Sequence, residues 1–423
     1  MSEVREGYKV TELGEIPSEW EITELINVVD TMYQGINTVA DKVIYQTEGI
    51  PILQAKHITS EQISFDGTKF ISIKDYEKYK VKFQPEIGDI LLTNIGTIGK
   101  VYFVDEFYKY LIAWNIFMIK VSQKINSNFL TYFLRRIEEL GHYDKLTTGN
   151  ATKFINKGQM GKILVPVPPL KEQQKIASIL STVDEQIDET EQLIVKTKEL
   201  KKGLMQQLLT KGIGHTEFKQ TELGEIPIDW EVTTLNDVLD IRDGTHDSPK
   251  YVDEGIPFVT SKNLKNGKLD FSDISYITED DHNKFSNRSH VENGDILFGM
   301  IGTVGNPIIV DLPFEISIKN VALIKFSESK MINKFVIEYL NSNFVLDQFK
   351  KFSNGGVQKF IALGMIRKLK IIVPKIEEQQ KIAQILSTVD EQIEVYEQEK
   401  AKYEELKKGL MQQLLTGQIR VKI

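Results

Sequence analysis

Two segments of this chain each occur twice, and this duplication restricts the fold to two copies of one frame. Glu172–Ile187 and Glu378–Ile393 differ at a single position and lie 206 residues apart. A second pair, Leu200–Thr210 and Leu406–Thr416, is identical and has the same offset. Near-identical segments are expected to fold alike and to meet the same kind of neighbour.

A third repeated motif opens each half of the chain. The sequence TELGEIP occupies Thr11–Pro17 and Thr221–Pro227, and a tryptophan follows it at Trp20 and at Trp230. The stretches between the repeated segments have diverged widely. The pattern favours a frame that contacts the same partner twice and carries two inserts that recognise different things.

Composition places the chain among globular proteins with two or more domains. It has 423 residues, of which 41% are hydrophobic and 26% charged, which is ordinary for soluble domains. No apolar run approaches the roughly 18 residues that span a bilayer, and the first ten residues lack the apolar core of a signal peptide. We therefore expect a cytoplasmic protein without membrane contact. The absence of cysteine excludes disulfides and thiolate metal sites.

The repeated segments predict two long helices. Each follows a proline-containing strand-like run and has apolar residues at period 3.5–3.6, as in a coiled-coil seam. About 38 residues at roughly 1.5 Å each would extend on the order of 55–60 Å. A narrow seam favours one partner helix, so we expect the two helices to pair with each other, antiparallel. The alternative is that each helix packs only on its own domain.

The inserts predict mixed α+β domains of roughly 150 residues. Short runs rich in β-branched residues alternate with Gly, Asn and Asp, and a helical pattern follows at Asn128–Leu140 and at Asn333–Phe349. The expected strands are Ile90–Thr93, Val101–Val104, Ile116–Val121, Ile296–Phe298, Pro307–Val310 and Val321–Phe326. The expected segments are a first recognition domain at 1–168, a first helix at 169–211, a second recognition domain at 212–374 and a second helix at 375–423.

Charge is distributed unevenly along the chain. The net charge is −8, whereas a basic surface is the usual sign of a nucleic-acid binder. However, 145–162 contains four lysines and no acid, and 350–370 contains five lysines, Arg367 and no acid. These segments occupy equivalent places in the two halves, so they are either solvated loops or phosphate-facing rims. The paired glycines at 96–99 and 302–305 are either phosphate-binding backbone or tight turns.

Motifs for catalysis are missing from the sequence. No phosphate loop, dinucleotide-binding GxGxxG or HExxH occurs, and the six histidines show no ligand spacing. Val183–Gln186 faintly resembles an ATPase acidic box, but it lies inside the predicted helix and recurs in the other copy. We therefore expect no active site, no metal site and no cofactor in this chain.

The junction into each helix resembles a known family. Pro168–Ala177 is a Pro-Pro-Leu-Lys-Glu-Gln-Gln-Lys-Ile-Ala entry, and Pro374–Ala383 is a looser copy. Two variable domains that each end in such an entry resemble the DNA-specificity subunit of type I restriction–modification systems. The resemblance implies an α+β fold with two target-recognition domains, joined by an antiparallel coiled coil in an internal pseudo-twofold repeat.

The resemblance also implies partners. Each domain would recognise one half of a bipartite, asymmetric site in double-stranded DNA. Two methyltransferase (modification) subunits would dock on the frame and supply the chemistry of S-adenosylmethionine. Motor–nuclease (restriction) subunits, which use ATP and Mg²⁺, are an optional addition.

Candidate DNA-binding residues share three features. They are polar, and their side chains are suited to base edges or phosphates. Each of them flanks a predicted strand, follows the repeated Glu-Gly-Ile-Pro turn, or lies in an acid-free segment or in the divergent loop near residue 242. The candidates are Lys56, His57, Asn115, Thr148, Asn150, Thr152, Lys153, Arg242, His246, Lys262, Asn263, Asn320, Asn354, Gln358 and Lys359.

Two other classes of function stay open at this point. One is a duplicated protein–protein scaffold without direct DNA readout, which the net charge of −8 favours. The other is a self-sufficient nuclease or methyltransferase, which the missing motifs disfavour.

Overall fold

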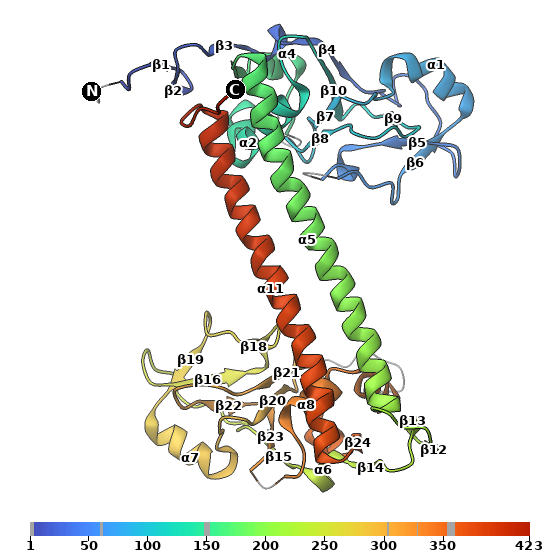
Figure 1. The fold of residues 1–423 in the computed structure, drawn as a ribbon, viewed down its shortest axis with the longest axis vertical. Helices are drawn as coiled ribbons and strands as arrows, with labels where there is room; N and C mark the ends of the chain where they lie inside the picture. Colours follow the sequence, from blue (N-terminus) through green and yellow to red (C-terminus); the bar gives the residue numbers. More distant parts are fainter. Residues whose placement is uncertain (1–3, 60–61, 148–152, 303, 328, 353–359) are drawn as a thin grey trace. The chain divides into compact units, whose positions relative to one another are not determined.

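The computed structural model describes residues 4–59, 62–147, 153–302, 304–327, 329–352 and 360–423. The chain folds into two compact units: Met1–Glu191 with Gln398–Ile423, and Gln192–Glu397. We call these the first and the second unit. Each combines one insert with part of both long helices, α5 (Leu170–Lys211) and α11 (Ile376–Leu415) (Figure 1). Among the described residues, no helix has a stretch apolar enough to cross a membrane.

The first unit contains a four-stranded and a three-stranded sheet. The four-stranded antiparallel sheet has the order β4 (Val29–Gln34), β10 (Ile116–Val121), β7 (Ile90–Thr93), β8 (Val101–Phe103). The three-stranded sheet has the order β6 (Lys69–Ile71), β5 (Ile50–Leu53), β9 (Leu111–Ile112). Two strand pairs complete the β-structure, β1 (Tyr8–Thr11) with β2 (Gly14–Pro17), and β3 (Glu21–Glu24) with β11 (Leu164–Val167). The shorter helices are α1 (Ile73–Phe83), α2 (Ser127–Glu139), α3 (His142–Leu146), α4 (Lys157–Gly161), η1 (Leu25–Asn27) and η2 (Ala55–His57).

The second unit repeats this plan. Its four-stranded sheet has the order β15 (Asp240–Asp243), β23 (Val321–Lys325), β20 (Ile296–Gly299), β21 (Gly305–Ile309). Its three-stranded sheet has the order β19 (Ser275–Ile277), β16 (Ile256–Thr260), β22 (Ser317–Lys319). Its strand pairs are β12 (Phe218–Thr221) with β13 (Gly224–Pro227), β14 (Glu231–Thr234) with β24 (Lys370–Val373), and β17 (Leu264–Lys265) with β18 (Lys268–Leu269). Its shorter helices are α6 (Leu235–Val238), η3 (Ser261–Asn263), α7 (Glu279–Ser289), α8 (Asn333–Leu340), α9 (Asn343–Phe352) and α10 (Leu363–Arg367).

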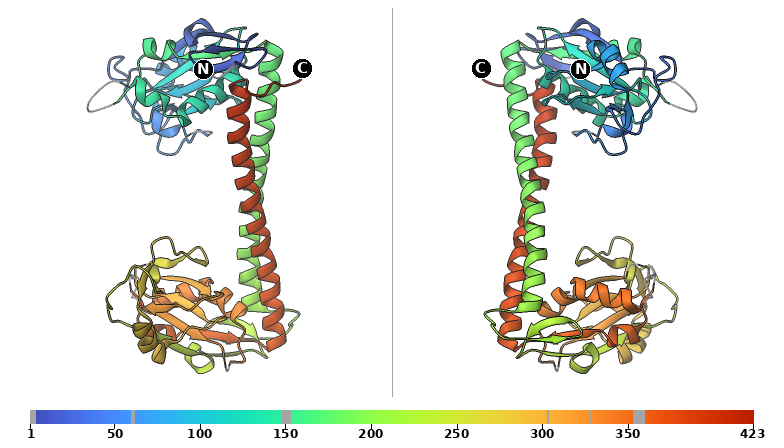
Figure 2. Two further views of the ribbon diagram at one scale, coloured as in Figure 1. Left: turned by 90° about the vertical axis from the view of Figure 1, so that its left-hand side faces the viewer. Right: turned by 90° about the vertical axis from the view of Figure 1, so that its right-hand side faces the viewer.

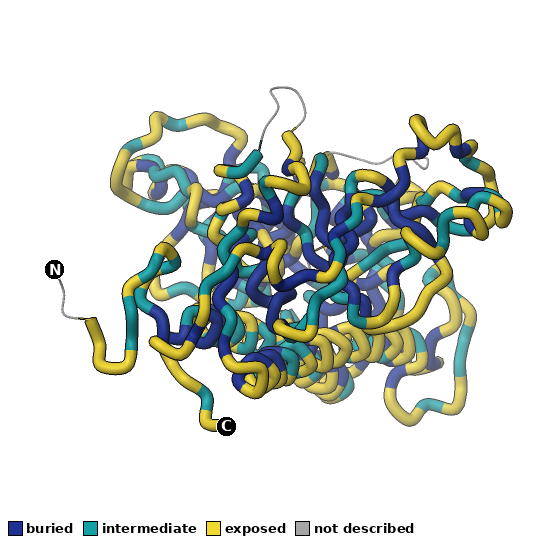
Figure 3. The backbone as a smooth tube through the Cα atoms, turned by 90° about the horizontal axis from the view of Figure 1, so that it is seen from above, coloured by how far each residue is buried: buried dark blue, intermediate teal, exposed yellow. Residues whose placement is uncertain are grey.

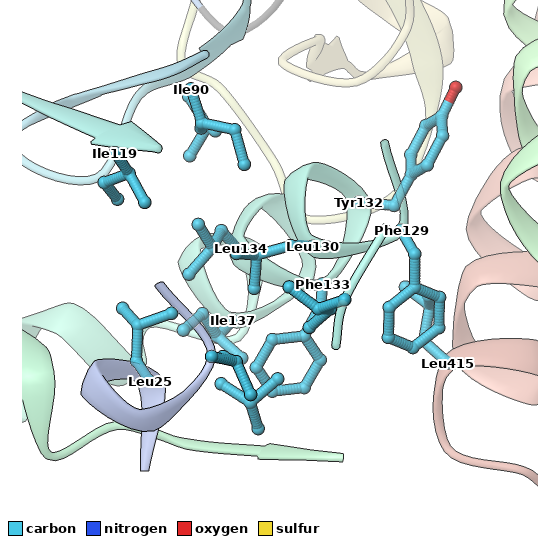
Figure 4. Close-up of a cluster of buried hydrophobic side chains, with 14 of the residues drawn as sticks. Leu25, Ile90, Ile119, Phe129, Leu130, Tyr132, Phe133, Leu134, Ile137 and Leu415 are labelled. Carbon is cyan, nitrogen blue, oxygen red and sulfur yellow. The ribbon is translucent and has the colours of Figure 1, made fainter. Parts of the chain in front are cut away.

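The core of the first unit lies where α2 packs between the sheet and the long helices. Leu130 and Leu134 of α2 lie toward Ile90 and Ile119 of the sheet, and Phe129 lies beside Leu415 of α11, as Figure 4 shows. The side chain of Asn126 accepts the amide of Phe129 at 3.0 Å and caps the start of α2. The central strands are buried and the connecting loops are exposed (Figure 3).

The expected strands are confirmed, with one or two residues of difference at their ends. The helical pattern at Asn333–Phe349 is confirmed, but the structure divides it into two helices, α8 and α9. The break falls at Asn341-Ser342, where the Ser342 hydroxyl donates to the Tyr339 carbonyl at 2.6 Å. Asparagine and serine compete in this way for backbone hydrogen bonds and disfavour helix interiors.

The long helices pair antiparallel within each unit, as predicted. In the first unit Asp184 and Glu191 contact Lys407 and Lys400 at 2.7 and 2.5 Å. In the second unit, Lys201 contacts Asp390 at 2.6 Å. The helices also pack on the inserts, since Ile176 and Leu180 join the core of the first unit, and Ile382 and Leu386 that of the second. Figure 2 shows each insert against the flank of its helix pair.

The repeated Glu-Gln-Gln and tryptophan form the joint between helix and insert. Glu172 is fully buried, and its carboxylate accepts from Trp20 Nε1 at 3.1 Å and from Arg420 Nε at 2.6 Å. Its counterpart Glu378 accepts from Trp230 Nε1 at 2.8 Å, and His215 Nε2 lies 2.9 Å from it. A buried carboxylate needs such partners. The glutamate and the tryptophan therefore occur in both halves, because each unit contains the same joint.

Candidate nucleic-acid interface

In each unit, the loop after the first strand of the four-stranded sheet crosses very close to a neighbouring chain segment. A Cβ atom at Gly244 would lie 2.3 Å from the Ile318 carbonyl oxygen, and one at Gly35 would lie 2.3 Å from that of Ile112. Only glycine permits this approach. The loop that follows the first strand therefore has the same crossing point in both units.

Around Gly244, four polar side chains form a connected cluster. His246 Nδ1 lies 2.6 Å from Asn320 Oδ1, and its Nε2 lies 3.0 Å from Asp243 Oδ2. The Arg288 guanidinium pairs with the same Asp243 carboxylate. Asn320 has a left-handed backbone with φ 53°, which asparagine tolerates better than most residues. The predicted residues His246 and Asn320 thus come together, and the amide group of Asn320 is available to donate.

A serine attaches this cluster to the turn after β20. Ser261 Oγ donates to the Asn320 carbonyl at 3.3 Å and accepts the amide of Met300 at 3.1 Å. The next residue, Ile301, pairs with Phe360 in a short antiparallel bridge. Phe360 is 52% exposed, and Ile301 is exposed as well. We call the surface formed by 243–246, 261–262, 301, 320 and 360 the recognition edge of the second unit.

The first unit builds the same edge with different side chains. The Asn94 amide donates to the Asn115 carbonyl at 3.2 Å, and Ile95 pairs with Phe154, which is 38% exposed. Ile112 and Ile318 are matched in the two three-stranded sheets, and three residues separate Ile112 from β10, whereas two separate Ile318 from β23. As a result, the backbone amide of Trp114 donates to the Ile36 carbonyl in the first unit. The backbone amide of Asn320 makes the equivalent hydrogen bond to the Thr245 carbonyl in the second unit.

That extra residue changes which side chains are equivalent. Asn115 and Asn320 both precede matched strands, but the backbone position of Asn320 is taken in the first unit by the exposed Trp114. Asn115 is half-buried, and its Oδ1 is buried without a hydrogen-bond partner. The recognition edge of the first unit comprises 35–37, 94–95, 114–115 and 154.

Two predicted residues have local structural roles. His57 and Asn263, both 3% exposed, cap equivalent 3₁₀ turns. The Gln54 amide donates to His57 Nδ1 at 2.9 Å, and the Thr260 amide donates to Asn263 Oδ1 at 3.0 Å. Burial, with the charge of Lys56 beside it, lowers the pKa of His57. In this conformation neither side chain is available to DNA, because both face the protein interior.

The predicted cations are more accessible but differ in their partners. Lys56 is exposed, and Lys262 is exposed with Asp273 at 3.0 Å. Lys153 is exposed, with Asp144 at 3.9 Å. The Arg242 guanidinium is bound to its neighbour, with Nε 2.8 Å from Asp240 Oδ2. The remaining predicted residues, Thr148, Asn150, Thr152, Asn354, Gln358 and Lys359, lie outside the described residues.

Sequence reasoning missed the exposed aromatic residues of both edges. The signal that could have found two of them is a repeated Lys-Phe-Ile, which contains Phe154 in one half and Phe360 in the other. Exposed aromatic faces stack on nucleic-acid bases, so Trp114 also belongs among the candidates. Among the described residues, no group of three or more acidic or histidine side chains is arranged to hold a metal ion.

A family model matches both halves of the chain. The model, described as the type I restriction modification DNA specificity domain, covers residues 17–199 and 227–405. The chain belongs to this family. Its two matches correspond to the two repeats, so each unit contains one specificity domain.

Two relatives of the chain match nearly its whole length. The chain is 32% identical to the putative type I restriction enzyme MjaX specificity subunit of Methanocaldococcus jannaschii, over 99% of this chain and 97% of the relative. It is 29% identical to the MjaVIII specificity subunit of the same organism, over 96% and 94%.

A solved structure shares the fold of the specificity protein. It is the S subunit of a type I restriction–modification system from M. genitalium, with TM-score 0.58, 14% identity and 96% of each chain covered. A chain from a study of the assembly and conformational transition of the type I R-M system gives TM-score 0.57 and 16% identity, over 96% of this chain and 99% of the other.

Proposed function

We propose that this chain is the DNA-specificity subunit of a type I restriction–modification complex and that each unit recognises one half of a bipartite, asymmetric site in double-stranded DNA. The observation that carries the proposal is the pair of recognition edges. The backbone crossing at Gly35 and Gly244 is the same, but it presents Trp114 in one unit and Asn320 with His246 in the other. A shared backbone frame with two different recognition edges suits two domains that recognise different DNA sequences.

The chemistry of the edges suits duplex DNA. Asparagine can donate and accept on the edge of an adenine, and aromatic side chains contact base faces or thymine methyl groups. Lys56, Lys153 and Lys262 are exposed near these groups in sequence and could bind phosphates, which position a protein without specifying sequence. Asn320 is therefore the strongest single candidate for base readout in the second unit.

The partners follow from the family. Two modification subunits would bind the duplicated frame and supply S-adenosylmethionine chemistry, and restriction subunits would add ATP- and Mg²⁺-dependent steps. This chain contributes recognition, and its own residues need no cofactor for that task. The helices α5 and α11, of 42 and 40 residues, would set the separation of the two half-sites.

The test exchanges the recognition domain of the second unit. Residues 240–368 are replaced by the equivalent segment of a relative with a different target, and methylation by the assembled complex is mapped across a genome. We expect one half-site to change and the other to stay, because the first unit is untouched. A change of both half-sites, or of neither, would refute independent readers.

A protein scaffold without DNA readout is the second candidate, favoured by the net charge of −8. Phosphate contacts make affinity fall steeply as salt rises, by nearly one logarithmic unit per contact per tenfold change in salt. Binding of the assembled complex to its duplex site, titrated with salt, therefore separates the candidates. A flat salt response would favour the scaffold.

A further inference from the structure

In the second unit, the last turn of α7 meets the recognition edge. α7 packs against β15 and β22; β15 ends at Asp243, and β22 ends one residue before Asn320. Arg288 lies in the last turn of α7, and its Nη2 donates to Oδ1 of the Asp243 carboxylate. Arg288 therefore stands beside the recognition edge, although it is 45 residues away from Asp243 in the sequence.

The Asp243 carboxylate is buried, whereas the groups that it holds are exposed. Its side chain is 9% exposed, and those of Arg288 and His246 are 62% and 61% exposed. One carboxylate oxygen binds Arg288, and the other binds His246, which connects in turn to Asn320. Water competes less for a buried carboxylate, so its hydrogen bonds hold their partners more firmly than those of an exposed one. Asp243 thus fixes the directions of two side chains at the protein surface.

The shared fold of the two units does not require this pair. The helices α1 and α7 both have 11 residues, and Lys82 stands at the position of Arg288, 206 residues earlier. An exposed Gln34 stands at the position of Asp243, one residue before the crossing glycine. The Lys82 ammonium lies over the Tyr33 ring, 5.1 Å from its centroid. The pair therefore belongs to the features that differ between the units, as the recognition edges do.

The Arg288 guanidinium keeps donors for a ligand. Arginine has five N–H groups in one plane, and Asp243 is the one partner of this guanidinium among the described residues. The backbone of Arg288 is supported as well, because Arg242 Nη1 donates to its carbonyl at 3.4 Å. A guanidinium held through one N–H of Nη2 still has the other N–H of Nη2 and both of Nη1. These donors suit a ligand with two acceptors side by side.

We propose that Arg288 recognises a guanine in the half-site of the second unit and that Asp243 positions Arg288 for this contact. The inference rests on the proposed function, in which the recognition edge contacts DNA. Guanine presents its acceptors N7 and O6 side by side in the major groove, and a guanidinium donates to both at once. Asn320, at the other end of the connected cluster, contacts a second base.

A phosphate contact would not need this arrangement. Phosphates are bound by lysine as well as by arginine, and such contacts carry no sequence information. Recognition of a base edge needs a planar group in a fixed direction, which a carboxylate partner provides. The charge of Asp243 also offsets part of the attraction between Arg288 and a phosphate. The pair therefore favours a base over the backbone of the duplex.

The test uses the complex assembled with modification subunits. Exchange of 240–368 first identifies the half-site of the second unit, and methylation rates are then measured on duplexes with each base pair at each position of that half-site. We expect Arg288→Ala to relax one G·C position by about tenfold to a hundredfold and to leave the first half-site unchanged. The matched control is Lys284→Ala, because Lys284 is exposed and lies one turn before Arg288 on the same face of α7. It should change the preference at no position.

Three results would overturn the proposal. The first is unchanged preference in Arg288→Ala, and the second is a half-site without a G·C pair. The third is equal weakening of binding to all duplexes with a salt slope smaller by about one, which would assign Arg288 to a phosphate.

The role of Asp243 is tested with a double variant. Asp243→Asn should weaken the preference at the same G·C position, and it should add nothing there when Arg288 is already alanine. The double variant also removes the buried charge that Arg288→Ala leaves behind, so it reports on recognition even where the single variant is unstable. Additive losses at that position would show that Asp243 does not act through Arg288.

Failure of this inference differs from failure of the proposed function. If exchange of 240–368 changes the half-site while Arg288→Ala does not, the second unit recognises DNA without Arg288, and the inference alone is wrong. If the exchange changes neither half-site, the proposed function is wrong, and the inference falls with it.

Discussion

The contact between the C-terminal tail and the first unit gives the sharpest stability prediction. Arg420 holds the fully buried carboxylate of Glu172 with two nitrogens, Nε at 2.6 Å and Nη2 at 2.9 Å. The substitution Arg420→Met removes both donors and leaves Trp20 Nε1 as the remaining donor to that carboxylate among the described residues. The carboxylate must then stay charged with one partner, bind water or take up a proton.

The magnitude follows from burial and geometry. Breaking a buried ion pair by removing one partner costs about 3–5 kcal/mol. The Arg420 side chain is 34% exposed, so water can enter when it is truncated and offset part of the loss. We therefore expect a cost of about 2–3 kcal/mol in the free energy of unfolding. In a unit of roughly 200 residues this lowers Tm by about 5–10 °C.

The assay is differential scanning calorimetry combined with hydrogen exchange. Exchange measured over 8–20 and 170–180 reports on the first unit, and 218–230 serves as an internal reference in the second. A matched control is Lys198→Met, which breaks an exposed pair with Glu397 at 2.7 Å and should cost about 1 kcal/mol or less. Adding Glu172→Gln to Arg420→Met should recover part of the loss, because the buried charge is then gone. A Tm change below about 2 °C for Arg420→Met would refute the reasoning.

Four further predictions concern recognition and catalysis. Asn320→Ala should relax one position of one half-site, by about 1–3 kcal/mol of discrimination, and leave the other half-site intact; methylation mapping that finds an unchanged site would remove Asn320 from the interface. Lys153→Ala with Lys359→Ala should weaken duplex binding and reduce the salt slope by up to about two units; an unchanged slope in a salt titration would place both lysines away from DNA. Four residues inserted after Thr210 should lengthen α5 by roughly 6 Å. The spacer between the half-sites should then grow by one or two base pairs of about 3.4 Å, and the half-site sequences should not change. An active variant whose methylation map keeps the original spacer would show that the helices do not set the separation of the half-sites. The purified chain alone should neither methylate nor cleave DNA; methyl transfer from S-adenosylmethionine by the isolated chain would contradict this.

The sequence by itself determined the duplicated frame, the two long helices and most strands. Heptad periodicity is a local property, and over some 40 residues it leaves no competing structure. Strands such as Ile90–Thr93 and Ile116–Val121 are buried in the sheet, so they appear in sequence as short apolar runs between turn residues. The family resemblance rested on the same repeated segments, which is why it extended over the whole chain.

Only the tertiary structure decided which residues share a site. His246 and Asn320 are 74 residues apart and meet because Gly244 lets two backbones cross. One extra residue in the first unit puts Trp114 in the place of Asn320. Neither event leaves a local pattern, because both depend on contacts between segments distant in sequence.

The same distinction explains the joint between helix and insert. The repeated Glu172 and Glu378 are visible in sequence, but their contacts with a tryptophan and with Arg420 or His215 depend on segments that are distant in sequence. In the second unit the Tyr339 hydroxyl donates to the Lys370 carbonyl, and the first unit has Phe133 at the equivalent position. A single oxygen atom matters here only because a strand carbonyl lies 2.7 Å away, and that distance is set by packing.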